Sequence, residues 1–122
     1  MKDLVHKLLD WNGEYLICDS DLTIDKISEV FAERFDVFAN GRNYLNVDHE
    51  IYFDFLCGFK ETIAKIDYKV IDIIVDNKSV VLPMIAEVTR LDETIDIFDV
   101  MLWLKYDGEN KIILWHEIYI QK

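Results

Sequence analysis

The chain has 122 residues, and we predict a single domain over residues 1–122. Hydrophobic residues make up 52% of the sequence, which is enough for a full core and excludes general disorder. Acidic residues number 24 against 13 basic ones, a net charge of −11. So acidic a chain has too few cations to neutralise a row of phosphates or an anionic lipid surface. We therefore expect neither nucleic acid nor a membrane as a partner.

Several common kinds of site and signal are not expected. Cys18 and Cys57 stand far apart without a CxxC pair, which predicts reduced thiols rather than a disulfide framework or a thiolate zinc site. The three histidines fall in distant segments and no glycine-rich phosphate loop occurs, so we expect neither a metal nor a cofactor. The first residues carry scattered charges instead of an apolar signal region, which favours a cytoplasmic location.

The first half of the chain has the hydrophobic spacing of helices. A first helix is predicted up to about Tyr15, and a second from Ile24 to Phe38, ended by Asn40-Gly41. Arg42, beside that stop, is expected on the surface, where it could border a pocket mouth. After a short extended piece at 43–47, Asp48 can cap a third helix. The expected buried stripe of this third helix is Ile51, Phe55, Phe59, Ile63 and Ile66.

The second half has the period of strands. We predict four antiparallel strands near 68–76, 79–90, 94–106 and 111–121, joined by short polar turns into a meander. Pro83 falls inside the second of these strands. Because proline has no N–H group, this position requires a sheet edge or an irregularity in the pairing.

Two-residue turns at 77–78, 92–93 and 108–109 would fix which residues face each other. In that register Asp99 and His116 are diagonal neighbours and the only polar groups inside an apolar face. A carboxylate and an imidazole on an apolar wall form either a satisfied structural pair or a proton-transfer unit, and the pattern leaves both interpretations open.

The opposite face of the predicted sheet is also apolar. It includes Val100, Leu102 and Trp115, and a few acids such as Glu117 interrupt it. Two apolar faces need two covers, and three helices in a chain of this length can cover only one. We therefore expect a homodimer formed through the outer face of the sheet.

The order of the segments carries a family resemblance. The helix ending in RFDVFANG (34–41), the run FDVM (98–101) and the hairpin YDGENKIILWHEIY (106–119) resemble the NTF2-like or SnoaL-like superfamily, which includes ketosteroid isomerases and scytalone dehydratase. The resemblance implies an α+β cone, with three N-terminal helices packed on a curved antiparallel sheet, and chemistry without a cofactor. Against ketosteroid isomerase, Tyr15 falls on the oxyanion-hole tyrosine and Asp99 on the protonated aspartate that donates a hydrogen bond. The general base of that family falls at Ala39, which cannot abstract a proton.

Two functions follow from these patterns. The first is a non-catalytic module that binds a small apolar molecule or serves as a dimerising accessory, and the residue at Ala39 favours it. The alternative is a cofactor-independent isomerase or dehydratase acting on a small apolar, oxygenated substrate. In that alternative Asp99 and Tyr15 donate hydrogen bonds and His116 is the acid or base. The expected ligand-binding wall in either case is Trp103, Met101, Phe35, Phe55 and Ile118.

Overall fold

The computed structural model describes all 122 residues as three α-helices, a 3-10 turn and one seven-stranded sheet. The helices are α1 (Lys2–Tyr15), α2 (Ile24–Ser28) and α3 (His49–Phe59), followed by the 3-10 turn η1 (Lys60–Thr62). The strands are β1 (Phe31–Ala39), β2 (Arg42–Val47), β3 (Ile63–Val70), β4 (Ile74–Asp76), β5 (Ser79–Arg90), β6 (Ile95–Tyr106) and β7 (Ile112–Gln121).

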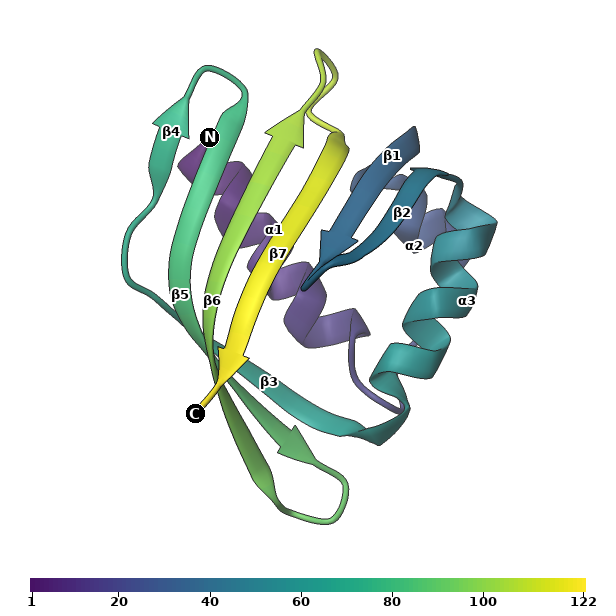
Figure 1. The fold of residues 1–122 in the computed structure, drawn as a ribbon. Coiled ribbons are helices and arrows are strands. Elements are labelled where there is room, and N and C mark those ends of the chain that lie inside the picture. Colours follow the sequence, from purple (N-terminus) through teal and green to yellow (C-terminus); the bar gives the residue numbers. More distant parts are fainter.

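The sheet is mixed and curved. Its strand order is β2-β1-β7-β6-β5-β3, with β4 also paired to β5, and all pairs are antiparallel except the parallel pair β1–β7. In Figure 1, α1 lies behind the long strands and α3 lies beside the β1–β2 hairpin. One face of the sheet thus packs against helices, and the face toward the viewer is uncovered.

The predicted second helix is wrong beyond Ser28, where α2 ends. After Glu29 and Val30, nine residues form β1, which buries alternate side chains at Phe35, Val37 and Ala39. Asn40 and Gly41 have positive φ angles of 49° and 87°, which suit a two-residue turn between antiparallel strands. These residues therefore turn β1 back into β2 instead of ending a helix. The expected block of three N-terminal helices is divided by this hairpin.

The other predicted helices and most of the strands are confirmed. The side chain of Asp48 caps α3 by accepting a hydrogen bond from the Ile51 amide at 2.8 Å. The predicted third helix is too long, because α3 ends at Phe59 while Ile63 and Ile66 lie in β3. Within α3 the expected buried stripe is also wrong, because Tyr52 and Leu56 are buried while Ile51 and Phe59 are exposed. Strands β5, β6 and β7 form the predicted meander, and the predicted strand at 68–76 is divided into β3 and β4.

Pro83 explains why β3 and β4 are separate strands. It lies in β5 opposite the interruption at residues 71–73, and its carbonyl accepts a hydrogen bond from the Ile71 amide at 2.9 Å. In an antiparallel pair the N–H and C=O groups of one residue point to the same neighbour. The missing N–H of Pro83 therefore falls where regular pairing has stopped, as the sequence requires.

The predicted register of the sheet is wrong by one residue at the β5–β6 turn. The Arg90 amide donates to the Thr94 carbonyl at 2.8 Å, and Glu93 adopts a φ of 72°, so three residues form the loop instead of two. A slip of one residue exchanges the two faces of a strand. Strands β6 and β7 are therefore turned over relative to β5. The buried face carries Val80, Leu82, Met84, Val100, Leu102, Leu104 and Trp115.

Candidate acid–base site

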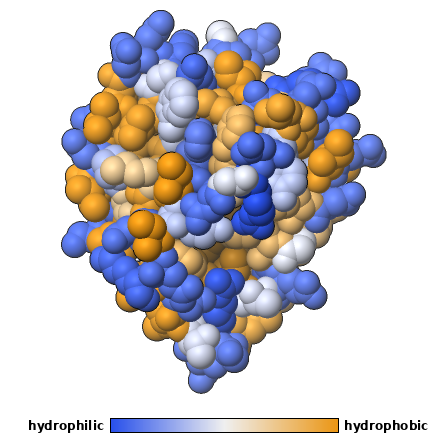
Figure 2. All heavy atoms as spheres, in the orientation of Figure 1, coloured by the Kyte–Doolittle hydropathy of each residue, from blue (hydrophilic) through white to orange (hydrophobic).

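A cavity opens between the inner face of the sheet and the helices. Its larger part has a volume of about 140 Å³ and its smaller part about 70 Å³. Most of the lining is apolar, and both parts share Phe59, Tyr68, Glu117 and Tyr119. In Figure 2 a hollow with apolar atoms at its floor and hydrophilic atoms at its rim lies beside the tip of the β1–β2 hairpin. The remaining polar residues of the lining are Asn12, Arg42, Tyr52 and Arg90.

Glu117 is the only acid in this lining. It lies in the middle of β7, opposite the fully buried Leu102 of β6 and the buried Ala39 of β1. Burial raises the pKa of the Glu117 carboxyl to about 7, although the Arg42 guanidinium acts in the opposite direction. Near neutral pH both ionisation states of Glu117 are populated, so it can accept or donate a proton.

Two tyrosines lie on the cavity wall within the electrostatic reach of Glu117. Burial is the main cause that raises the pKa of Tyr52 and of Tyr68, and the charge of Glu117 raises both further. Both phenols therefore stay neutral hydrogen-bond donors. The hydroxyl of Tyr68 accepts a hydrogen bond from Asn12 Nδ2 at 3.3 Å, which leaves its own proton available.

Asn12 contributes a hydrogen-bond acceptor to the cavity. Its side chain is buried in α1, and its Oδ1 atom has no hydrogen-bond partner. A buried acceptor without a partner is costly, and such atoms occur where a ligand or water completes the site. Asn12, Tyr68 and Glu117 together give the cavity an acceptor, a donor and a proton carrier.

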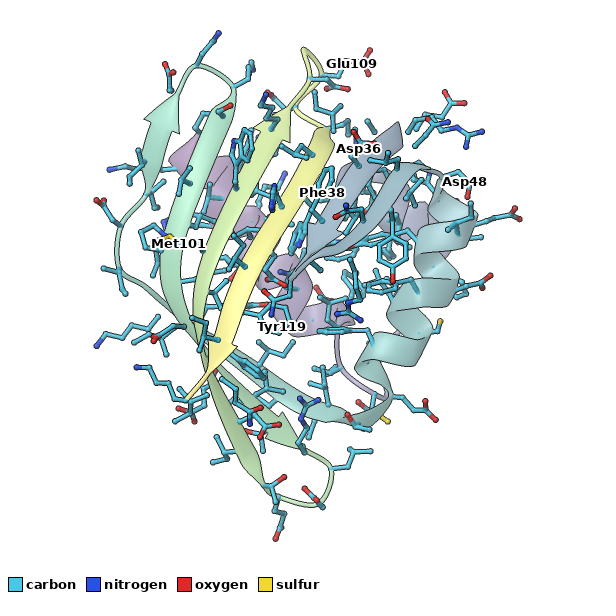
Figure 3. The ribbon with its side chains drawn as sticks, in the orientation of Figure 1. Asp36, Phe38, Asp48, Met101, Glu109 and Tyr119 are labelled. Carbon is cyan, nitrogen blue, oxygen red and sulfur yellow. The ribbon has the colours of Figure 1, made fainter.

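The rim of the cavity is held by the hairpin tip. The Asn40 side chain makes two hydrogen bonds of 2.8 Å to the backbone of Tyr119, one to its carbonyl and one from its amide. Arg42 Nη2 donates to the Tyr119 hydroxyl at 3.2 Å. Figure 3 shows Tyr119 on β7 beside this tip. The expectation that Arg42 borders the pocket agrees with its place in the lining.

The predicted contact between Asp99 and His116 is wrong. The β6–β7 turn is longer than the predicted two residues, since the Asp107 amide donates to the Lys111 carbonyl at 2.8 Å and the register is irregular at Tyr106. The pairing of β6 with β7 is thereby shifted by two residues. Asp99 pairs with Ile120 and His116 with Trp103, so the two lie far apart along the strands. Asp99 lies on the outer face and forms an ion pair with Lys122 at 3.2 Å. His116 is also on the outer face, between Phe38 and Trp103, with ring centroids 4.9 and 5.8 Å away.

The remaining predicted site residues are mostly outside the cavity. Met101 and Ile118 pair across β6 and β7 on the outer face and are more than half exposed; Figure 3 labels Met101 there.

Tyr15 is buried against Trp11, with ring centroids 5.4 Å apart, and Lys26 Nζ lies 5.8 Å from the centroid of the Tyr15 ring. Phe35 belongs to the core, where it packs on Phe31 and Tyr52. Of the predicted ligand-binding residues, Phe55 lines the cavity.

Sequence reasoning missed Glu117 as a site residue because of the register. Trp115, Glu117 and Tyr119 alternate along β7 and point inward, a pattern that is visible in LWHEIY. A two-residue β5–β6 loop would place this face of β7 on the exterior, where Glu117 would only interrupt an apolar surface. A single acid between two aromatic residues at a spacing of two is the signal that finds it.

Neither a metal cluster nor a membrane span adds to this site. The structure contains no group of three or more histidine, cysteine or acidic side chains placed to hold a metal ion. No helix combines the length and the apolar character needed to cross a lipid bilayer.

Comparisons with known proteins identify the fold of the chain. No protein-family model matches the chain, and no curated protein matches it. Solved structures do match. A candidate polyketide cyclase from Acidithiobacillus ferrooxidans aligns with a TM-score of 0.77 at 12% identity, over 97% of this chain and 86% of that one. Structures of NTF2-like proteins match as well. The chain has the NTF2-like fold.

Two further solved structures align over most of the chain. A candidate SnoaL-like polyketide cyclase from Jannaschia aligns with a TM-score of 0.70 at 11% identity, over 97% of this chain and 85% of that one. A protein with a ketosteroid isomerase-like fold from Catenulispora acidiphila, in complex with trimethylamine, has a TM-score of 0.71 at 12% identity, covering 96% and 85%. At such low identities the structural match establishes the NTF2-like fold alone. The reaction has to be inferred from the residues of the site.

Proposed function

We propose that the protein is a cofactor-independent proton-transfer enzyme, an isomerase or dehydratase, acting on a small oxygenated substrate with an apolar body. The observation that carries this proposal is Glu117, a carboxyl with a pKa of about 7 inside an apolar cavity. Enzymes raise carboxyl pKa values toward the working pH because a general base or acid is most effective there.

The surrounding groups suit the enolisation of a carbonyl compound. The Glu117 carboxylate takes the proton from the carbon next to the carbonyl. The electron pair of the broken C–H bond forms a carbon–carbon double bond, and the π pair of the carbonyl moves onto its oxygen. The neutral hydroxyls of Tyr68 and Tyr52 are hydrogen-bond donors for the resulting oxyanion. Protonated Glu117 then returns the proton to the same or another carbon, so no oxidant or cofactor is consumed.

The volume of the cavity limits the substrate. A cavity of roughly 150 Å³ accommodates benzene, and the larger part here has about 140 Å³. A substrate with a single ring or a short branched chain therefore fits, whereas a fused four-ring body does not. The polyketide cyclase-like structures share only their fold with this chain.

Proton exchange tests this function directly. In D2O the wild-type protein is expected to accelerate the α-proton exchange of small cyclic ketones such as cyclohexenone, followed by NMR. Glu117→Gln should lower this rate by about 100-fold or more, since positioned general bases contribute about 10²–10⁴-fold. Asp99→Asn, which removes a carboxylate from the outer face, should leave the rate unchanged. An unchanged rate in Glu117→Gln would refute the proposal.

One observation favours a non-catalytic ligand-binding module as the second candidate. Ala39 lines the smaller part of the cavity, at the position where the family resemblance expects the general base. Saturable binding of cyclohexenone without accelerated exchange would support this second function.

A homodimer through the outer sheet face remains part of the proposal. This face carries partly exposed apolar side chains, among them Met101, Trp103, Ile118 and Ile120. Figure 2 displays this face with several hydrophobic patches separated by hydrophilic atoms. Covering them with a second copy removes apolar surface from water.

A further inference from the structure

The arginines of the chain differ in whether they form an ion pair with a carboxylate. The sequence has three: Arg34, Arg42 and Arg90. Arg34 Nη1 lies 3.7 Å from Asp48 Oδ2, and Arg90 Nε lies 2.8 Å from Asp96 Oδ2. Arg42 has no carboxylate within ion-pair distance, although the chain contains 24 acidic residues. Arg42 lines the narrower part of the cavity, where its charge acts on Glu117 without forming an ion pair.

The hairpin turn holds the backbone of Arg42, whose side chain is exposed at the rim of the cavity. Arg42 pairs with Ala39 directly across the two-residue turn of the hairpin. The turn is tied to β7 by the two side-chain bonds of Asn40 to Tyr119 and by the Asn40 amide, which donates to the Glu117 carbonyl at 3.0 Å. The Tyr119 hydroxyl then accepts one N–H of Arg42. The remaining N–H donors of the guanidinium stay available, and their planar fork matches a carboxylate.

We propose that the cavity binds a small monocarboxylate, whose carboxylate pairs with Arg42 at the rim while its apolar body enters the cavity toward Glu117 and Tyr68. This inference rests on the proposed function and names the substrate class of the same site: a carboxylic acid of about one ring that also carries the reacting carbonyl or hydroxyl group.

The overall charge of the molecule makes a local cation necessary for such a ligand. With a net charge of −11, the protein repels anions at long range. An anionic substrate is admitted only where a positive group faces it at short range. Arg90, the other arginine in the lining, is already held by Asp96 and by the Thr62 hydroxyl, which leaves Arg42 as the anchor.

The test compares benzoate with its uncharged isostere benzamide by calorimetric titration. Wild-type protein is expected to bind benzoate at least 10-fold more tightly than benzamide. Arg42→Met should weaken benzoate binding by about 10–100-fold, the usual range for a charge-assisted hydrogen-bonded pair. The same variant should leave benzamide binding unchanged. Arg34→Gln removes an equal charge from an arginine outside the cavity lining and should leave both affinities unchanged.

Three results would overturn the inference. They are equal affinity for benzoate and benzamide in the wild type, an equal loss of benzoate binding in Arg34→Gln, or no binding of benzoate below about 10 mM, where the binding free energy is smaller than about 3 kcal/mol. Glu117→Gln should retain benzoate binding while losing proton exchange. The failure of the anchor and the failure of the catalytic proposal are thus read from different measurements.

Discussion

Glu117 makes the stability of the fold depend on pH. In the unfolded chain its carboxyl has an ordinary pKa of 4.5, and in the folded chain burial raises the pKa to about 7. Between these values the unfolded state has released the proton and the folded state has kept it. The unfolded state is therefore favoured progressively as the pH rises from 4.5 to 7, and the penalty stays constant above that. A shift of this size is worth at most about 3 kcal/mol.

Glu117→Gln should remove this pH dependence. Relative to the wild type, the variant is expected to gain about 2–3 kcal/mol in the free energy of unfolding between pH 5 and pH 8, because glutamine carries no proton to lose. Urea denaturation at both pH values measures it. Glu87→Gln, at an exposed position of β5, is the matched control and should show no such gain. Identical pH profiles for Glu117→Gln and the wild type would contradict a raised pKa at this position.

The β1–β2 hairpin is the element that brings Arg42 to the cavity, and Gly41 allows its turn. Gly41 has a φ of 87°, where a side chain is strained, although a Cβ there would meet no atom within 4 Å. Gly41→Ala should therefore lower the free energy of unfolding by about 1–2 kcal/mol through backbone strain alone. Chemical denaturation checks this.

Gly108 provides the control for Gly41. It also has open space around it, and its φ is outside the left-handed region. Gly108→Ala should therefore change the stability little. An equal loss in both variants would mean that the cost does not come from the positive φ of the hairpin turn.

Local signals explain which elements could be predicted from the sequence. The third helix has a capping aspartate at Asp48, and burial alternates along β5 and along most of β6, so the sequence predicts both kinds of element. The aromatic spacing at Phe31, Phe35 and Phe38 fits a helix as well as it fits β1, and only the pairing with β7 decides between them. Tertiary pairing of this kind is not contained in a local pattern.

The face on which each candidate site residue lies depended on a single loop. Asp92 and Glu93 suit a two-residue or a three-residue turn, and the positive φ of Glu93 selects the longer one. This difference moves Asp99 and His116 to the outer face and Glu117 into the cavity. The local pattern of the strands could not place these side chains, because the face of a strand depends on the length of the loop before it.

At the scale of the whole molecule, we expect the uncovered sheet face to form the proposed dimer. Ile118 is 54% exposed near the middle of that face. Ile118→Glu is expected to convert a dimer into a monomer in sedimentation at micromolar concentration, because two copies would bury like charges against each other. Leu91→Glu changes an equally exposed residue in the β5–β6 turn and should leave the dimer intact. A wild-type monomer under the same conditions would refute the dimer.

The parallel pairing of β1 with β7 also determines the order in which the molecule can become complete. β7 follows every other element in the chain, yet it lies between β1 and β6 in the sheet. Asn40 and Tyr119, which close the rim, are 79 positions apart. The hairpin that carries Arg42 therefore has no neighbour on one side until β7 is synthesised. Contacts between residues so far apart in the sequence slow folding, and the cavity becomes complete only with the last strand.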